Sequence, residues 1–150
     1  MACIIKDVTD KSWYTNSYHV DVREHIDAFK KLEFEEQFQK ISSGGCISYV
    51  EMPTVLKNTE ALKSIIRWAY NHIQYFEFNN KSDYCQECGY TGEMIINNHG
   101  KFECPQCHND DINKMYVVRR TCGYLGSQNW NAGKMNEFDN RYVHIGNDEL

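Results

Sequence analysis

Apolar residues in the first third of the chain recur at intervals typical of an amphipathic helix. The segment Glu24–Ile41 follows this pattern, but the spacing drifts at Leu32–Phe34, so we expect two shorter helices with a break between them. Residues 42–45 read Ser-Ser-Gly-Gly and indicate a helix C-terminus. Residues 13–20 are aromatic and β-branched, which favours a strand. The candidate core positions of the helical segment are Ile26, Phe29, Leu32, Phe34 and Phe38.

Short apolar runs in the next part of the chain flank a second helical pattern. Residues 46–52 and 73–78 both favour strands, and Pro53 closes the first. Thr59 can cap a helix over residues 60–71. Strand, helix and strand in succession indicate a right-handed βαβ unit and an α/β fold class, or α+β if this part stands alone. The expected buried face of the helix comprises Leu62, Ile65, Ile66 and Ala69.

Four cysteines have the spacing of a metal site. Cys85 and Cys88 form one C-x2-C pair, Cys104 and Cys107 form another, and fifteen residues separate the pairs. Each such turn directs two thiolates at one point, so the pattern predicts a tetrahedral zinc ribbon. Four thiolates leave no open coordination position, so the zinc would be structural. An iron–sulfur cluster, disulfides and a redox dithiol are the competing interpretations.

The residue after each cysteine pair fits this interpretation. Gly89 follows the first pair, where the turn tends to need a positive φ. His108 follows the second pair, and histidine is enriched at positive φ among residues other than glycine. His108 is also a conceivable ligand, but four thiolates already complete the site.

The composition of the chain disfavours nucleic-acid binding and membrane insertion. The chain has 150 residues and a net charge of −5, so it offers no basic footprint for direct nucleic-acid binding. No apolar run reaches membrane-spanning length, so we expect no membrane partner. The cysteines outside the metal pattern show no pairing, and we see no signal peptide, so we expect a reducing cytoplasm. These cysteines are Cys3, Cys46 and Cys122.

A glycine near the C-terminus lies in a distinctive loop. Residues 119–126 read R-R-T-C-G-Y-L-G, after an expected short strand at residues 115–118. An α-carbon radical at Gly123 would be delocalised by the flanking peptide groups if the α-carbon is planar, and a Cβ would clash in that geometry. The ordinary alternative is a glycine that only supplies a turn with positive φ. After this loop, Asn131 can cap a final helix ending near Tyr142.

Four segments in order resemble the anaerobic (class III) ribonucleotide reductases, which are glycyl radical enzymes. The loop at 119–126 resembles their radical loop. Residues 13–20 (W-Y-T-N-S-Y-H-V) and 43–51 (S-G-G-C-I-S-Y-V-E) resemble two further segments, with Cys46 where histidine is frequent. Residues 129–144 resemble the family's C-terminal N-x-G-K-x-x-E-x-x-x-R-V-x-H pattern. The resemblance extends from about residue 10 to the end.

The resemblance implies a C-terminal part of such a reductase. Residues 1–80 would supply the last βαβ elements of a ten-stranded α/β barrel, 81–114 the zinc ribbon, and 115–150 the glycyl radical loop and terminal helix. An S-adenosylmethionine-dependent iron–sulfur activating enzyme would install the radical on Gly123. The radical would then generate a thiyl radical for reduction of ribonucleotides to deoxyribonucleotides. The finger-loop cysteine that bears this thiyl is absent, so we expect no activity alone and a larger N-terminal reductase chain as partner.

Other residues receive weaker assignments. Asn16 and Ser17 are candidate substrate-binding residues by resemblance, and strand-end hydrogen bonding is the alternative. Arg119 and Arg120 could orient the loop or bind nucleotide phosphate, or be ordinary salt-bridged arginines. Cys46 is expected to be a core or edge cysteine. Cys122 is interpreted as a packing residue, His19 as a buried histidine, and Lys134, Glu137 and Arg141 as helix-surface ion-pair residues.

Two further functions remain open. A stand-alone glycyl radical part could replace an oxygen-cleaved C-terminus in a damaged reductase. A zinc-ribbon binding module without a radical role is the other alternative. Residues 83–114 contain only two lysines among several acids, which disfavours the latter.

Overall fold

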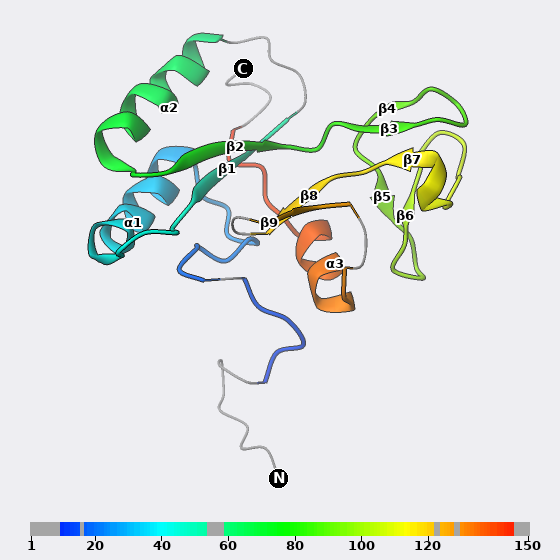
Figure 1. Ribbon diagram of the computed structural model, residues 1–150, viewed down its shortest axis with the longest axis horizontal. Coiled ribbons are helices and arrows are strands. Elements are labelled where there is room, and N and C mark those ends of the chain that lie inside the picture. Colours follow the sequence, from blue (N-terminus) through cyan, green and yellow to red (C-terminus); the bar gives the residue numbers. More distant parts are fainter. Residues whose placement is uncertain (1–9, 16, 54–58, 122–123, 128–129, 146–150) are drawn as a thin grey trace.

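The computed structural model describes residues 10–15, 17–53, 59–121, 124–127 and 130–145. It is a mixed α/β fold in which two helices and a pair of strands lie at one end and several short strands at the other (Figure 1). A hairpin and a C-terminal helix lie between these two ends. No helix among the described residues is both long and apolar enough to cross a membrane.

The expected βαβ unit is present. Strands β1 (Ser48–Met52) and β2 (Phe76–Asn80) are parallel, and helix α2 (Thr59–His72) connects them. Ser48 pairs with Phe76 and Met52 with Asn80. All five residues of β1 are buried, as is typical of a strand covered on both faces.

Strand β2 begins three residues later than we expected. The backbone N–H groups of Gln74 and Tyr75 donate to Oε1 of Gln39, at 2.9 and 3.3 Å. This side chain therefore replaces a neighbouring strand as the acceptor. The preceding helix matches its expected range closely, although Ile66, expected in the core, is 50% exposed.

A single helix, α1 (Ala28–Ile41), replaces the two short helices that we expected. Asp27 caps it by accepting a hydrogen bond from the backbone N–H of Lys30 at 3.0 Å. The expected break is wrong because the phenylalanines do not define the buried face: Phe29 and Phe34 are 41% and 46% exposed. The residues that α1 buries are Ala28, Lys31, Leu32, Glu35 and Gln39.

The expected strand at residues 13–20 is also wrong for the part that is described. Residues 17 and 18 form a turn, and Ser17 has a φ of +58°. A side chain of the segment accepts a hydrogen bond from the chain that follows it: the backbone N–H of Val22 donates to Oγ1 of Thr15 at 3.0 Å. Its aromatic side chains pack between elements without joining a sheet, as where the ring of Tyr18 lies 5.7 Å from that of Phe38.

The apolar core at this end is formed by the βαβ unit and α1. Leu32 and Val50 are completely buried in it, and Ile65 of α2 packs with them. Ile145, near the end of the described chain, closes the same core. The C-terminal segment is thus part of the βαβ core.

The other end is built from short strands. Strand β3 (Asp83–Cys85) pairs antiparallel with β4 (Thr91–Gly92) and with β7 (Met115–Tyr116). A second antiparallel pair joins β5 (Ile95–Ile96) to β6 (Phe102–Glu103). Such short strands bury little apolar surface and need other sources of stability. A 3-10 turn, η1 (Ile112–Lys114), leads into β7.

A hairpin and a short helix follow the short strands. Strands β8 (Arg119–Thr121) and β9 (Tyr124–Gly126) pair antiparallel. Helix α3 (Ala132–Asp139) is capped by Asn131, as expected, and ends three residues before the expected Tyr142. It ends early because Tyr142 donates its backbone N–H to the carbonyl of Val22 at 2.7 Å, which is incompatible with continuing the helix.

Helix α3 completes the apolar core of the short-strand end. Met135 and Phe138 from α3 pack with Met94, Phe102 and Met115. Trp130, just before the helix, packs against the same cluster and meets Phe138 edge-on, with ring centroids 5.0 Å apart. The helix therefore packs directly against the short strands.

Candidate functional site

The four cysteines lie at two matching turns. Cys85 closes β3, and the backbone N–H of Gly89 donates to its carbonyl at 2.9 Å. In the second turn, the N–H of His108 donates to the carbonyl of Cys104 at the same distance. Gly89 and His108 have φ values of +76° and +58°, which confirms the positive φ that we expected at both positions.

The sulfur atoms converge on one point. Sγ of Cys85 lies 3.7 Å from that of Cys107, and Sγ of Cys88 lies 3.6 Å from that of Cys104. All four lie within 4.8 Å of one another. A zinc ion bound by four thiolates at about 2.3 Å has sulfur–sulfur edges of about 3.8 Å. The spacing of this cluster therefore fits a tetrahedral metal ion such as zinc.

The thiol groups titrate unequally in this cluster. Burial opposes ionisation of Cys85, but backbone N–H groups of Cys88 and Glu87 lower its pKa to about 7. The pKa of Cys88 rises to about 12, because burial and the neighbouring thiols outweigh the hydrogen bond from the backbone of Tyr90. The pKa of Cys107 is also raised, although the backbone of Asn109 acts to lower it. Ionised thiolates at these distances would repel one another. A divalent cation that binds all four would offset this repulsion.

A buried ion pair connects the cysteine turns to the hairpin. Arg119 at the start of β8 donates to both carboxylate oxygens of Asp83, at 2.6 and 2.7 Å. The carboxylate of Asp83 has a further partner, because Met94 donates its backbone N–H to Oδ2 of Asp83 at 2.8 Å. Arg119 also stacks over Phe102, 5.0 Å from the ring centroid. Of the interpretations left open for Arg119, the structure shows the salt-bridged arginine.

The register of the hairpin defines where the candidate radical glycine lies. Arg119 pairs with Gly126, and Thr121 pairs with Tyr124. Residues 122 and 123 link the two strands and lie outside the described residues. The expected roles of Cys122 and Gly123 therefore fall outside the described residues.

Comparison with known proteins identifies the family. Residues 3–144 match the anaerobic ribonucleoside-triphosphate reductase family. The chain belongs to this family. It is 40% identical to the anaerobic ribonucleoside-triphosphate reductase of Escherichia coli (strain K12) over 150 residues, which cover 98% of this chain and 21% of the relative. It is 45% identical over 143 residues to the reductase of Enterobacteria phage T4, covering 93% of this chain and 24% of that protein.

A third reductase shows the same partial coverage. The anaerobic ribonucleoside-triphosphate reductase of Haemophilus influenzae (strain ATCC 51907 / DSM 11121 / KW20 / Rd) is 43% identical over 145 residues, 95% of this chain and 20% of its own. The chain thus spans between a fifth and a quarter of the length of these curated relatives. The relatives are enzymes by name.

Several charged residues within the segments that resemble this family form ion pairs in the structure. Arg120 forms an ion pair with Glu77 of β2, which joins the hairpin to the βαβ unit. Lys134 pairs with Glu137 as expected, but Glu137 is 1% exposed, so its assignment to the helix surface is wrong. It is buried because Arg141, itself buried, lies 2.9 Å from its carboxylate.

The structure describes only one of the two candidate substrate-binding residues. Asn16 lies outside the described residues. Ser17 is exposed and lines a cavity of about 540 Å³ with His19, Glu24 and Phe34. None of the cysteines of the cluster lines that cavity. His19 is buried, as expected, with its Nδ1 3.2 Å from Oε1 of Glu35.

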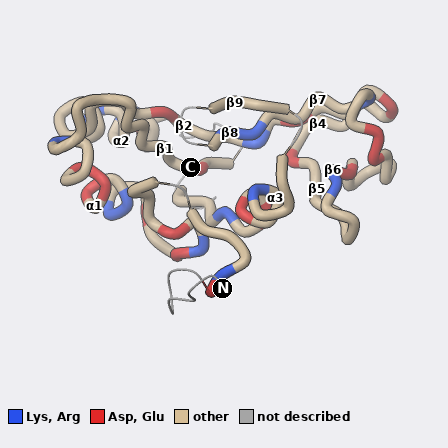
Figure 2. The backbone as a smooth tube through the Cα atoms, turned by 60° about the horizontal axis from the view of Figure 1, so that its bottom comes forward, with Lys and Arg blue, Asp and Glu red and all other residues tan. Residues whose placement is uncertain are grey.

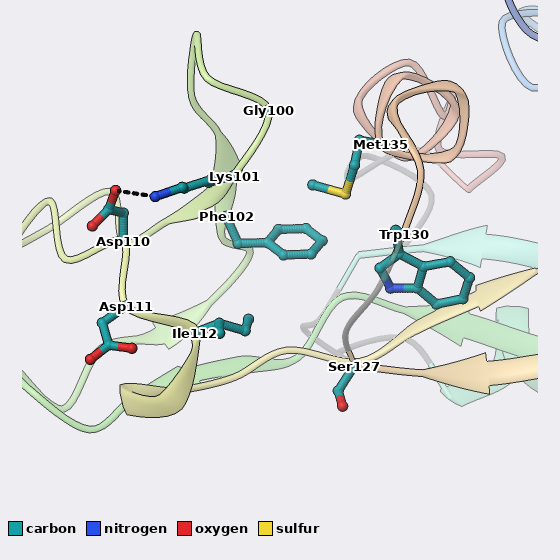
Figure 3. Close-up of a pocket in the computed structure, with 9 residues that line it drawn as sticks. All are labelled: Gly100, Lys101, Phe102, Asp110, Asp111, Ile112, Ser127, Trp130 and Met135. Carbon is teal, nitrogen blue, oxygen red and sulfur yellow. Dashed lines mark ion pairs between the residues drawn. The ribbon is translucent and has the colours of Figure 1, made fainter.

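A second cavity, of about 550 Å³, lies beside α3 and is lined by residues 100–102 and 110–112 together with Ser127, Trp130 and Met135 (Figure 3). Phe102 and Ile112 face it from one side, and Trp130 and Met135 face it from the other. Its rim carries Lys101, which pairs with Asp110 at 3.6 Å. No local pattern in the sequence predicts this cleft, because it exists only where residues 100–112 pack beside Trp130 and Met135.

Arg141, which the sequence suggested to be an ion-pair residue on the helix surface, is instead buried. It joins Glu51, Glu137 and the carbonyl of Arg120 in the buried centre of the molecule. Glu51 could have been recognised as an unusual residue, since a single carboxylate within the apolar run of β1 needs a buried partner. Nothing in the local sequence identifies that partner as a residue 90 positions away.

Proposed function

We propose that this chain is the glycyl-radical-bearing C-terminal part of an anaerobic ribonucleotide reductase. Gly123 would store the radical that generates the substrate-attacking thiyl radical for reduction of ribonucleotides to deoxyribonucleotides. The observation that carries the proposal is the hairpin register, with Thr121 opposite Tyr124, within a chain of this family. It makes Gly123 one of only two residues that link a short hairpin.

The cysteine cluster supports the proposal as a rigid base for the hairpin. We propose that Cys85, Cys88, Cys104 and Cys107 hold a structural zinc ion, whose four thiolates leave no position for substrate. The contact between Arg119 and Asp83 transmits the rigidity of this site to the first residue of β8. The zinc would therefore hold the loop in place and take no part in the radical chemistry.

The parallel strand pair supports the proposal that residues 1–80 belong to a larger barrel. Among the described residues, β1 and β2 form a two-stranded parallel sheet, which is unusual because parallel sheets are normally larger and covered on both faces. We propose that β1 and β2 are the last barrel strands, that residues 81–114 form the ribbon, and that 115–150 carry the radical loop. The remaining barrel elements and the finger-loop cysteine would come from the rest of the reductase, in the same protein or on a larger partner chain.

The proposed partners follow from this arrangement. A radical S-adenosylmethionine activating enzyme would remove the α-hydrogen of Gly123, and the ribonucleotide would bind to the assembled enzyme, with Asn16 and Ser17 as candidate contacts. Along the described backbone, basic positions are scattered among acidic ones, which disfavours a nucleic-acid interface (Figure 2). The proposed oxygen-sensitive radical chemistry suits a reducing cytoplasm.

Electron paramagnetic resonance tests the proposal directly. The chain is incubated without oxygen with a class III activating enzyme, S-adenosylmethionine and a reductant, with and without the remaining reductase chain. We expect a glycyl-type doublet that the Gly123→Ala variant lacks. Absence of the doublet with the larger chain present, while the activating enzyme modifies its own substrate, would contradict the proposal.

The partial coverage of the relatives keeps the repair function testable in the same system. An oxygen-cleaved reductase is mixed with the activated chain, and deoxyribonucleotide formation is measured. Recovery of activity in the cleaved enzyme would identify a replacement part. Activity only with a reductase that lacks this whole region would identify a constitutive subunit or segment.

A further inference from the structure

Arg141 lies where three separate parts of the fold meet. Its Nη1 donates to Oε1 of Glu51 in β1 at 3.0 Å. Its Nη2 donates to Oε1 of Glu137 in α3 at 2.9 Å and to the backbone carbonyl of Arg120 in β8 at 2.6 Å. One planar guanidinium therefore binds the βαβ unit, the terminal helix and the hairpin at once.

The surroundings of this guanidinium keep it charged and fixed. Its side chain is 1% exposed. Burial alone would lower the pKa of Arg141, but the carboxylates of Glu51 and Glu137 raise it. The guanidinium also lies over the rings of Phe138 and Tyr49, 4.9 and 5.5 Å from their centroids. A buried cation with two carboxylates and two aromatic faces is held in a single position.

The two carboxylates are themselves held in place. Asn79 of β2 donates to Oε1 of Glu51 at 2.6 Å, and Lys134 pairs with Glu137. The backbone of Glu51 is fixed as well, because its N–H donates to Nδ1 of His144 and its carbonyl accepts from the N–H of His144, both at 3.0 Å. Arg141 thus contacts Arg120 from a rigid platform.

The hairpin needs such an external attachment. Its strands have three residues each, and a two-stranded hairpin is marginally stable by itself in water. Arg119 and Arg120 attach it through their side chains, to Asp83 and Glu77. Arg141 differs because it binds the backbone of β8, at a residue three positions before Gly123. A contact to the backbone fixes the strand itself, whichever rotamers its side chains adopt.

We propose that Arg141 is a positioning residue for the radical loop, and that its contact with the Arg120 carbonyl sets the position of β8 against β1 and α3. The proposal rests on the proposed function only for the meaning of that position, since Gly123 follows β8. The positioning itself is a property of this chain and can be measured without a radical.

The sharpest variant is Arg141→Lys. Lysine keeps the charge, but its compact ammonium cannot reach two carboxylates and a carbonyl in the planar arrangement of the guanidinium. The matched control is Arg67→Lys, the same chemical change at an exposed position of α2. Both proteins are prepared as the full zinc-loaded chain, and bound zinc is measured for each.

Amide hydrogen exchange with mass spectrometry reads the positioning directly. In Arg141→Lys we expect exchange in peptides covering residues 119–126 to rise by about tenfold or more, because a charge-assisted hydrogen bond to the strand is lost. Exchange in residues 85–107 should stay as in the unaltered chain, and Arg67→Lys should change neither region. Unchanged exchange in the hairpin, or an equal rise in both regions, would overturn the proposal.

The glycyl radical signal, compared between variants with equal bound zinc, reports the position of the loop separately from general stability. With the activating enzyme and the remaining reductase present, we expect Arg141→Lys to give a several-fold weaker or shorter-lived doublet than Arg67→Lys. If the unaltered chain gives no doublet, the proposed function fails and hydrogen exchange alone decides the role of Arg141. A normal doublet in Arg141→Lys beside a normal unaltered chain would refute the positioning role.

A milder variant covers the case in which Arg141→Lys does not fold. Glu137→Gln preserves the shape and an acceptor oxygen but removes one of the two negative charges that face the guanidinium of Arg141. It should raise exchange in residues 119–126 by a smaller factor, with zinc content unchanged. Equal exchange in Glu137→Gln and the unaltered chain would then count against the proposal.

Discussion

At the scale of residues, the interior of this protein contains charged side chains that pair with one another. Lys31 and Glu35 of α1 are buried and lie 2.5 Å apart, and His19 completes the group. Gln39 donates to Oγ of Ser48 at 2.8 Å and so belongs to the same interior. These contacts explain why the apolar pattern wrongly predicted a break in α1: polar residues occupy much of its buried face.

The buried His144 should make the stability of the protein depend on pH. Burial, and then the charge of Lys31, lower the pKa of His144 from 6.5 to about 3. The unfolded chain therefore takes up a proton that the folded chain does not, so stability is lost as the pH falls below about 6.5. We expect the free energy of unfolding to drop by about 1 kcal/mol between pH 7.5 and 5.5 from this group.

Denaturant unfolding at several pH values measures this loss, with bound zinc monitored so that metal release is not mistaken for it. The His144→Asn variant, which cannot titrate, should show a flatter profile over the same range. A variant profile as steep as that of the unaltered chain would show that other groups cause the loss.

At the scale of elements, the short-strand end of the fold and α3 depend on one another. The strands β3 to β7 are two or three residues long, and the apolar core beside them is completed by Met135 and Phe138. Cys85 and Cys104 are completely buried within this core. The metal would therefore close the core from one side while α3 closes it from the other.

Removal of the metal should unfold this part selectively. Chelation, or the Cys104→Ser change, should expose residues 84–126 to proteolysis, because metal binding and folding are coupled in such ribbons. Helix α2 should remain protected, since its core contains no cysteine of the cluster. Mass spectrometry of the fragments measures this, with Cys46→Ser as the control cysteine outside the cluster. Equal protection with and without metal would contradict the expectation.

At the scale of the whole molecule, contacts between distant segments bring the hairpin next to both halves. Arg119 attaches it to the ribbon, Arg120 to β2, and Arg141 to β1 and α3. The family match covers residues 3–144, so it includes all of these attachments. The hairpin is thus the element where the two ends of the fold are joined.

Oxygen provides a test of the radical at this scale. If Gly123 carries the radical, exposing the activated protein to air should cut the backbone at this residue, because oxygen adds to the carbon radical. Intact-mass measurement should show two fragments that separate near residue 123. The Gly123→Ala variant, treated identically, should keep its full mass. An uncut chain after a verified radical signal would contradict the assignment to Gly123.

The sequence by itself determined the local features of this protein. Cysteine spacing predicted the convergence of four sulfur atoms, and strand–helix–strand patterning predicted β1, α2 and β2. The cap at Asn131 was also readable, because a cap depends only on residues three positions apart. Each of these signals acts over a short stretch of chain.

Only the tertiary structure decided which distant residues meet. Glu51 and Arg141 lie 90 positions apart, and Asp83 and Arg119 lie 36 apart. The sequence shows that a buried charge needs a partner, but any opposite charge could serve until the elements are packed. Packing also turned polar residues of α1 inward and ended α3 at Asp139. These outcomes depend on the summed contacts of several elements, which no local pattern specifies.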